Sequence, residues 1–290
     1  MVLLDMVATN AGGFRDRHFA GAGWTGDFAV AHYDHGIRGE ESHADADFVR
    51  AKCRQYGVRL ITAQGNLPPD TGEDKARRAR YSFLGRVAKK ESENGGEEAY
   101  IATAHHQDDL LETIVMNLIR GTGWRGLTPM SRADVVRPLI DMTKVDIVRY
   151  ALEHDLDWRE DKTNDSPDYW RNRLRAQVIG RLLTERNKML ALCHRQRRLR
   201  AEIDNEVTRY IEQRVGCVDN RPVMYRYDLI MLPADVAIEI LRRLTKGWLT
   251  RPQLGQLLLF IKVGKPSKQL SWKRLNVRLD VRRVYFYPAM

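Results

Sequence analysis

The segment 103–113 (Thr-Ala-His-His-Gln-Asp-Asp-Leu-Leu-Glu-Thr) places two adjacent histidines just before three carboxylates. An apolar, strand-like stretch precedes it, and apolar residues at helical spacing follow it. Asp109 and Glu112 are three positions apart, so they share one face of the predicted helix. Ligands of α/β folds bind at the carboxyl ends of strands. The pattern therefore predicts acids and imidazoles grouped at one strand end.

A purely structural interpretation of the two aspartates stays open. Acidic residues favour the first turn of any helix because they complement its positive end. This accounts for Asp108 and Asp109, but it does not account for His105 and His106. A zinc hydrolase is a further alternative, since histidines and carboxylates bind zinc. The spacing, however, matches none of the common zinc patterns.

Composition bounds the class of protein. The chain has 290 residues, 43% of them hydrophobic, which is enough for two domains with apolar cores. It contains no apolar run of membrane-spanning length and no secretory leader, so we expect no membrane partner. Its three cysteines, at positions 53, 193 and 217, form no Cys-x-x-Cys pair. They are typical of reduced thiols in a cytoplasmic protein.

The net charge of +10 is unevenly distributed. Residues 1–170 hold 22 Lys and Arg against 28 Asp and Glu, a balance of −6. The remaining 26 basic and 10 acidic residues give 171–290 a balance of +16. Basic residues recur from Arg171 to Arg283 rather than in one run, which favours a nucleic acid partner over a merely solvated surface.

Strand-like and helix-like segments alternate through the first half of the chain. The predicted strands are 28–32, 58–63, 99–103 and 135–136. The predicted helices are 42–56, 73–90, 107–120 and 143–154, and a Gly-rich polar stretch at 10–26 is predicted to be a surface loop. This alternation predicts an α/β fold with a doubly wound parallel sheet.

From residue 172 the pattern changes to a smaller, mainly helical basic region. Helices are predicted at 174–192, 196–213, 229–244 and 253–261, and residues 270–288 alternate like a strand pair. We expect two domains, residues 1–185 and residues 186–290.

Seven short motifs, in order along residues 1–185, resemble those of the tRNA(Ile)-lysidine synthetases, a family of N-type PP-loop ATP pyrophosphatases. They lie at 32–38, 76–84, 103–113, 120–123, 137–139, 160–164 and 171–175. The resemblance implies a PP-loop, Rossmann-like fold. It also implies ATP-dependent ligation of lysine to the wobble cytidine of a minor isoleucine tRNA with a CAU anticodon, releasing AMP and pyrophosphate.

One family motif is missing from the sequence. The phosphate loop Ser-Gly-Gly-x-Asp-Ser is absent, and residues 1–7 resemble the helix that follows this loop. We therefore expect a chain that begins past the ATP-binding element, through a misassigned start codon or truncation, and whose sheet has a gap in its middle. Because a phosphate loop supplies the backbone donors for polyphosphate, the chain as written is expected to be poorly stable and inactive.

The resemblance assigns candidate roles to individual residues. Asp109 is the candidate ligand of Mg²⁺, with a salt link to the incoming lysine amine as the alternative. His105 is the candidate for polarisation or proton transfer near the base. Arg171 completes the catalytic set and, with Arg175, is a candidate for binding the lysine carboxylate.

Further residues are candidates for binding substrates. Glu112 and Glu160 are expected to bind the lysine amines, and Arg173 is a candidate contact for tRNA phosphate. The remaining candidates follow a strand and are expected to form an adenine pocket for ATP, with a purely structural turn as the alternative. They are His32, Asp34 and His35.

Expected partners are the isoleucine tRNA and free lysine, and a homodimer is left open. Two other functions remain. A tRNA thiolase of the same superfamily would need cysteines for sulfur or an iron–sulfur cluster, which three scattered cysteines do not favour. A non-catalytic tRNA-binding remnant that has lost ATP use is the second.

Overall fold

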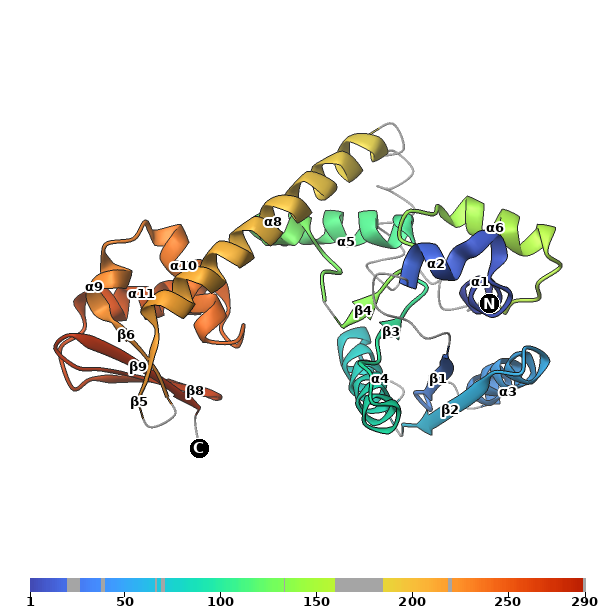
Figure 1. Cartoon of the computed structure of the whole chain (residues 1–290), viewed down its shortest axis with the longest axis horizontal. Helices are drawn as coiled ribbons and strands as arrows, with labels where there is room; N and C mark the ends of the chain where they lie inside the picture. The colour runs from blue at the N-terminus through green and yellow to red at the C-terminus, as the bar shows by residue number, and fades with distance from the viewer. Residues whose placement is uncertain are drawn as a thin grey trace. The chain divides into compact units, whose positions relative to one another are not determined.

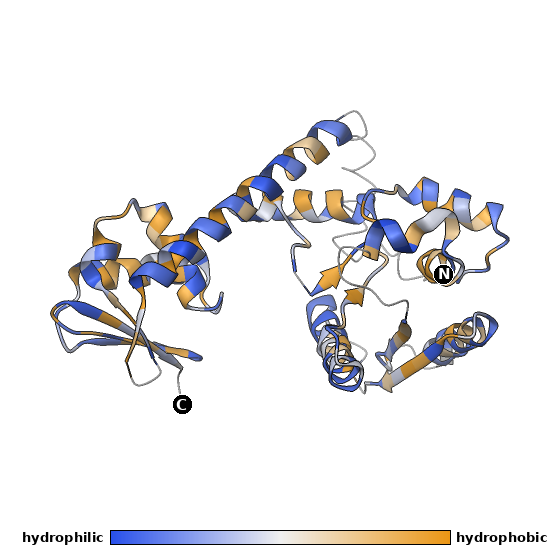
Figure 2. Ribbon diagram, viewed as in Figure 1, coloured by the Kyte–Doolittle hydropathy of each residue, from blue (hydrophilic) through white to orange (hydrophobic). Residues whose placement is uncertain are grey.

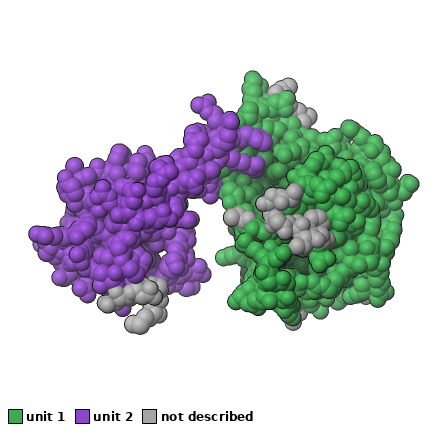
Figure 3. Space-filling model, in the orientation of Figure 1, with its two compact units in different colours: residues 1–193 green, residues 194–290 purple. Residues whose placement is uncertain are grey.

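The computed structural model describes residues 1–19, 27–37, 40–65, 67–68, 71–132, 134–159, 185–218 and 221–288. The chain divides into two compact units, residues 1–193 and 194–290 (Figure 3). The boundary lies eight residues beyond the predicted one at 185. None of the described helices is long and apolar enough to cross a membrane.

The first unit contains two pairs of parallel strands (Figure 1). β1 (Ala29–Asp34) pairs with β2 (Arg59–Gln64), and α3 (Glu40–Gln55) connects them. β3 (Ile101–Ala102) pairs with β4 (Val135–Val136). Parallel pairing with a helical crossover confirms the predicted α/β class.

Helix α4 (Glu73–Gly95) joins the two strand pairs and packs against both β1 and β3. α5 (Gln107–Ile119) follows β3, and the short helix η3 (Trp124–Leu127) comes before β4. In the described residues the strands form two separate sheets, β1–β2 and β3–β4.

An apolar cluster holds the first helices of the chain together. α1 (Val2–Thr9) is hydrophobic along most of its length (Figure 2) and packs with α6 (Lys144–Glu153). The prediction of a surface loop at 10–26 is wrong for residues 11–19, which form η1 (Ala11–Gly13) and α2 (Phe14–Phe19). The reason is Phe14, which is buried in the same cluster and anchors α2.

A buried carboxylate adds a polar tie inside this cluster. The side chain of Asp5 on α1 accepts hydrogen bonds from the hydroxyls of Tyr56, at 2.7 Å, and Tyr150, at 2.6 Å. Asp5 is buried, so these two donors replace the water that a carboxylate otherwise needs. The tie links α1, the end of α3 and α6.

In its described residues, the second unit combines the greater part of α8 and three shorter helices with an antiparallel sheet. α8 (Arg186–Arg214) begins in the first unit and continues into the second as one helix, so the predicted break between residues 192 and 196 is wrong; Cys193, inside that break, is buried against Leu110 and Ile114 of α5. α9 (Arg226–Ile230), α10 (Ala234–Leu244) and α11 (Arg251–Val263) follow. The strands are β5 (Gly216–Val218), β6 (Arg221–Tyr225), β7 (Gln269–Trp272), β8 (Leu275–Leu279) and β9 (Arg283–Pro288).

The five strands are ordered β5-β6-β9-β8-β7, and helices cover one face of this sheet (Figure 1). Alternate residues of β8 and β9, such as Val277, Leu279 and Phe286, pack in one core with Leu257 and Ile261 of α11. The opposite set of alternate residues forms the uncovered face. The sequence predicted a strand pair at 270–288, and the structure has three strands there and two more at 216–225.

Candidate functional site

The start of α5 fixes the first of the predicted site residues. His106 is the residue that caps this helix, and its backbone N–H donates to Asp109 Oδ2 at 3.0 Å. The His106 ring lies 3.4 Å from the same oxygen. These contacts hold the Asp109 carboxylate at the carboxyl end of β3, where its side chain remains 20% exposed.

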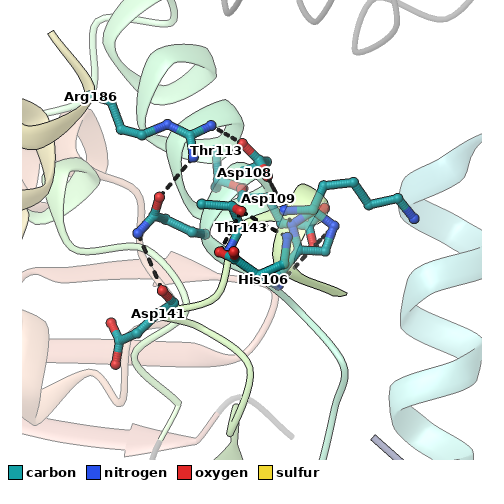
Figure 4. Close-up of polar contacts among 10 residues, drawn as sticks. His106, Asp108, Asp109, Thr113, Asp141, Thr143 and Arg186 are labelled. Atoms are coloured by element: carbon teal, nitrogen blue, oxygen red, sulfur yellow. Dashed lines mark hydrogen bonds and ion pairs between the residues drawn. The ribbon is translucent and has the colours of Figure 1, made fainter. Parts of the chain in front are cut away.

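Asp108 is a structural residue. It forms an ion pair with Arg186 at the start of α8, and its Oδ2 accepts the backbone N–H of Lys144 at 2.7 Å (Figure 4). Arg186 also donates to the Gln107 side chain at 2.9 Å. Asp108 thus ties together α5, α6 and the beginning of α8. The structural interpretation is therefore favoured for Asp108, whose two oxygens are engaged by Arg186 and Lys144, whereas the Asp109 carboxylate contacts its own helix cap, His106.

His105 lies next to Asp109 with a neutral imidazole. Its Nδ1 is 2.8 Å from the hydroxyl oxygen of Thr103. Burial lowers the pKa of His105 to about 4, since Asp109 offsets only part of the burial effect and nearby arginines add to it. At neutral pH this side chain can donate or accept a hydrogen bond, but it carries no proton to give up as an imidazolium.

Three arginines surround His105 closely enough to depress the pKa of its ring: Arg77, Arg80 and Arg137. Arg77 stacks over the ring of Tyr81 at 4.9 Å on α4. Burial lowers the pKa of Arg80, and the charge of Arg77 adds to this effect. The carboxyl end of β3 is therefore an environment that attracts anions.

These arginines were not among the predicted site residues. Two signals pointed to them: the motif at 76–84, and Arg137 in the motif at 137–139. Arg137 donates to the backbone oxygen of Met130 at 2.6 Å and to that of Val135 at 3.0 Å, which fixes its position beside β4. Their proximity to His105 depends on how α4 packs, and sequence spacing does not show that.

A depression lined mostly by basic residues lies along α4. Its lining residues are Asp74, Arg77, Arg78, Tyr81 and Arg132. The guanidinium of Arg132 stacks over Tyr81 at 5.0 Å, on the same ring that Arg77 contacts. Two arginines thus share one tyrosine next to the site.

The residues predicted to bind adenine lie at the end of another strand. His32 and Asp34 are on β1, and His35 follows directly. Asp34 Oδ1 accepts the backbone N–H of Gly36 at 2.8 Å, which shapes the turn, and burial lowers the pKa of His32. Tyr33 contacts both His35 and Phe83 of α4. The structure therefore joins this turn to the β3 site through α4.

The other predicted residues have different outcomes. Glu112 is on α5 and fully buried, so no solvent reaches its carboxylate in this structure. Glu160, Arg171, Arg173 and Arg175 lie outside the described residues. Their predicted contacts with lysine and tRNA stay predictions.

The described side chains offer few ligands for a metal ion at this strand end. Among the described residues no group of three or more His, Cys, Asp and Glu side chains could hold a metal ion. Asp108 is engaged by Arg186 and Lys144, which leaves Asp109 to offer a carboxylate at this strand end. One carboxylate fits a Mg²⁺ ion held mainly by water and substrate phosphates, and it does not fit a closed metal site made by the protein alone.

Comparison with known proteins assigns the first unit. Residues 5–182 match the PP-loop domain. The chain belongs to this family. The matched region contains β1 to β4 and every site residue that the sequence predicted. Family membership agrees with the parallel strand pairs, the helical crossovers and the placement of polar residues at strand ends.

The resemblance to tRNA(Ile)-lysidine synthetases is confirmed by relatives of this PP-loop protein. The tRNA(Ile)-lysidine synthase of Solibacter usitatus is 31% identical over 269 residues, covering 89% of this chain and 60% of that protein. That of Thermotoga maritima is 33% identical over 231 residues, covering 74% and 53%. That of Bacillus anthracis is 37% identical over 171 residues, covering 55% and 35%. The chain spans about half the length of these curated relatives.

Among solved structures, the U34-tRNA thiolase NcsA from Methanococcus maripaludis with its [4Fe-4S] cluster is similar with a TM-score of 0.47 and 16% sequence identity. The match covers 60% of this chain and 62% of the thiolase.

Proposed function

We propose that this PP-loop protein carries the catalytic region of an enzyme that ligates lysine to the wobble cytidine of an isoleucine tRNA with a CAU anticodon. The observation that carries the proposal is the strand end of β3. There an oriented carboxylate, Asp109, lies beside a neutral histidine, His105, in surroundings made positive by arginines. The relatives named tRNA(Ile)-lysidine synthase support this substrate class.

The reaction has two steps, and each needs charge of a particular sign. The cytosine O2 attacks the α-phosphorus of ATP, the bond to pyrophosphate breaks, and pyrophosphate leaves. The lysine ε-amine then attacks C2, AMP leaves with the oxygen, and the amine loses a proton. The first step develops negative charge on phosphate oxygens, which Arg77, Arg80 and Arg137 are suited to stabilise.

Asp109 suits the step that involves lysine. Its carboxylate is held by the His106 N–H on one oxygen and stays partly exposed. It can orient an ammonium group or, in the other assignment, hold Mg²⁺. When bound, Mg²⁺ would neutralise charge on the phosphates of ATP. Both assignments predict that Asp109→Asn abolishes ligation, because an amide binds neither cation well.

His105 acts in this proposal as a neutral hydrogen-bonding group. Its low pKa keeps the ring uncharged at neutral pH, so it does not repel the nearby arginines. A neutral imidazole can donate a hydrogen bond to the cytosine carbonyl or accept one from the lysine amine. It does not supply a proton as an acid.

The test is lysine incorporation. Purified protein, prepared both from Met1 and with the in-frame codons upstream of Met1, is incubated with ATP, labelled lysine and tRNA(Ile) bearing the CAU anticodon. The proposal predicts lysine in the tRNA, with AMP and pyrophosphate released in equal amounts. If both preparations bind the tRNA and neither incorporates lysine, the RNA-binding remnant is the correct interpretation.

A further inference from the structure

The uncovered face of the second unit's sheet carries several tyrosines and arginines on neighbouring strands. The register puts Tyr225 of β6 directly opposite Arg283 of β9. It also puts Tyr285 of β9 opposite Arg278 of β8. Paired residues of an antiparallel sheet lie on the same face, as do residues two apart on one strand. Tyr287 and Arg221 therefore belong to this face as well.

Stacking contacts hold these side chains in place. The Arg283 guanidinium lies over the Tyr225 ring at 5.4 Å, and that of Arg221 lies over the Tyr287 ring at 5.3 Å. The Tyr287 hydroxyl donates to the Gln269 side chain at 2.9 Å. The aromatic rings are thus oriented without being buried, and Tyr225 is 49% exposed.

The charge of the face is one-sided. None of the described strand residues on it is acidic. At its edge, the Asp280 carboxylate accepts the Tyr285 hydroxyl and the backbone N–H groups of Arg282 and Arg283. By sequence, residues 194–290 hold 20 Lys and Arg against 9 Asp and Glu. The partner that complements this surface is a polyanion.

We propose that this sheet face binds unpaired RNA nucleotides, which stack on the tyrosines and arginines while the guanidinium groups contact phosphates. Exposed aromatic side chains on a sheet are a recurrent platform for bases, and stacking needs bases that are free of a duplex. Paired bases are already stacked and offer only their backbone. The proposal rests on the proposed function only for the identity of the RNA, since a tRNA offers unpaired nucleotides in its loops.

The experiment measures binding of the whole protein to a labelled, unstructured RNA of about 12 nucleotides and to a duplex of the same length. The test variant is Y225L/Y287L, which keeps apolar side chains on the strands. Its matched control is Tyr227→Leu, because Tyr227 is 67% exposed and lies on α9 rather than on the sheet. Circular dichroism confirms that each variant is folded.

The double variant is expected to lose about tenfold in affinity for the single strand and to change little for the duplex, whereas Tyr227→Leu matches the parent protein. Arg278→Gln is expected to reduce the slope of log affinity against log salt by about 0.7, with Arg243→Gln on α10 as the charge control. Equal affinities for test and control variants would overturn the proposal. So would an equal loss for the duplex, or binding of poly-glutamate in place of RNA.

This assay contains neither ATP nor lysine, so its failure is separable from that of the proposed function. A protein that binds RNA through this face and never incorporates lysine would retain the sheet proposal and lose the catalytic one. If Y225L/Y287L incorporates lysine as the parent protein does and binds RNA with unchanged affinity, the sheet proposal is lost and the catalytic proposal is retained.

Discussion

The ion pair between Asp108 and Arg186 should stabilise the first unit without taking part in chemistry. Both side chains are mostly buried, with 16% and 17% exposed. Asp108 also accepts the Lys144 N–H. Breaking a buried pair by removing one partner costs about 3–5 kcal/mol, and partial exposure reduces this toward about 2–3 kcal/mol for Asp108→Ala. Asp108→Asn keeps an acceptor for Lys144, so we expect about 1–2 kcal/mol.

Urea unfolding followed by fluorescence measures these losses, and the thermal midpoint should fall by about 2–4 °C per kcal/mol. A double-mutant cycle with Arg186→Gln isolates the pair. We expect a coupling energy of about 1–2 kcal/mol, because the two single variants remove the same contact. If the two substitutions add within about 0.5 kcal/mol, the contact is not energetically coupled and the reasoning fails.

Three further predictions concern the rest of the molecule. Burial and the hydrogen bond to Asp5 raise the pKa of Tyr56 to about 12, so the folded state retains a proton that the unfolded chain releases above pH 10. The free energy of unfolding should therefore be unaffected by this group below pH 10 and fall between pH 10 and 12. If the free energy of unfolding of Tyr56→Phe falls as steeply with pH over this range as that of the parent protein, this prediction is wrong. The ring of His105, assigned in NMR spectra by comparison with His105→Gln, should titrate near pH 4, and a midpoint at or above 6 would show that the imidazole is not buried as described. Ile261→Ala should destabilise the second unit by about 3 kcal/mol, because the side chain is fully buried, whereas Val263→Ala, 71% exposed, should change the unfolding free energy by less than about 0.5 kcal/mol.

The fold of the first unit was predictable because its strands are short apolar runs bounded by turns. The predicted strands at 58–63 and 135–136 match β2 and β4 within one residue, and the predicted helix at 107–120 matches α5. The period of apolar residues carries this information locally. The pairing of the strands needs only the rule that parallel neighbours are joined by crossovers.

The errors have physical causes that local pattern does not contain. Residues 11–19 are polar and Gly-rich, yet Phe14 finds an apolar pocket made by α1 and α6, and tertiary packing then decides the conformation. The strands β5 and β6 are short and follow a long helix, and β6 joins the sheet through β9, which lies about 60 residues later in the chain. Sequence periodicity does not report such a distant partner.

The sequence predicted an acid and a histidine at a strand end, but it did not predict the arginines that complete the candidate site. The strand-end motif identified His105 and Asp109. The structure distinguishes the two neighbouring aspartates by their contacts, because Asp108 forms an ion pair with Arg186 and Asp109 contacts His106. The arginines that surround His105 come from α4 and from the end of β4. These arginines lie about 30 residues before and after His105 in the chain. Their proximity to its ring depends on how these segments pack, and residue spacing alone does not show it.

The central claim is that Asp109 serves the chemistry of lysine ligation. The most direct measurement compares lysine incorporation into tRNA(Ile) by Asp109→Asn, by Asp108→Asn and by the parent protein in the form that incorporates lysine, with tRNA binding measured in parallel. We predict that Asp109→Asn loses incorporation while its tRNA affinity is unchanged, and that Asp108→Asn keeps incorporation at a temperature where it is folded. Near-normal incorporation by Asp109→Asn would contradict the account.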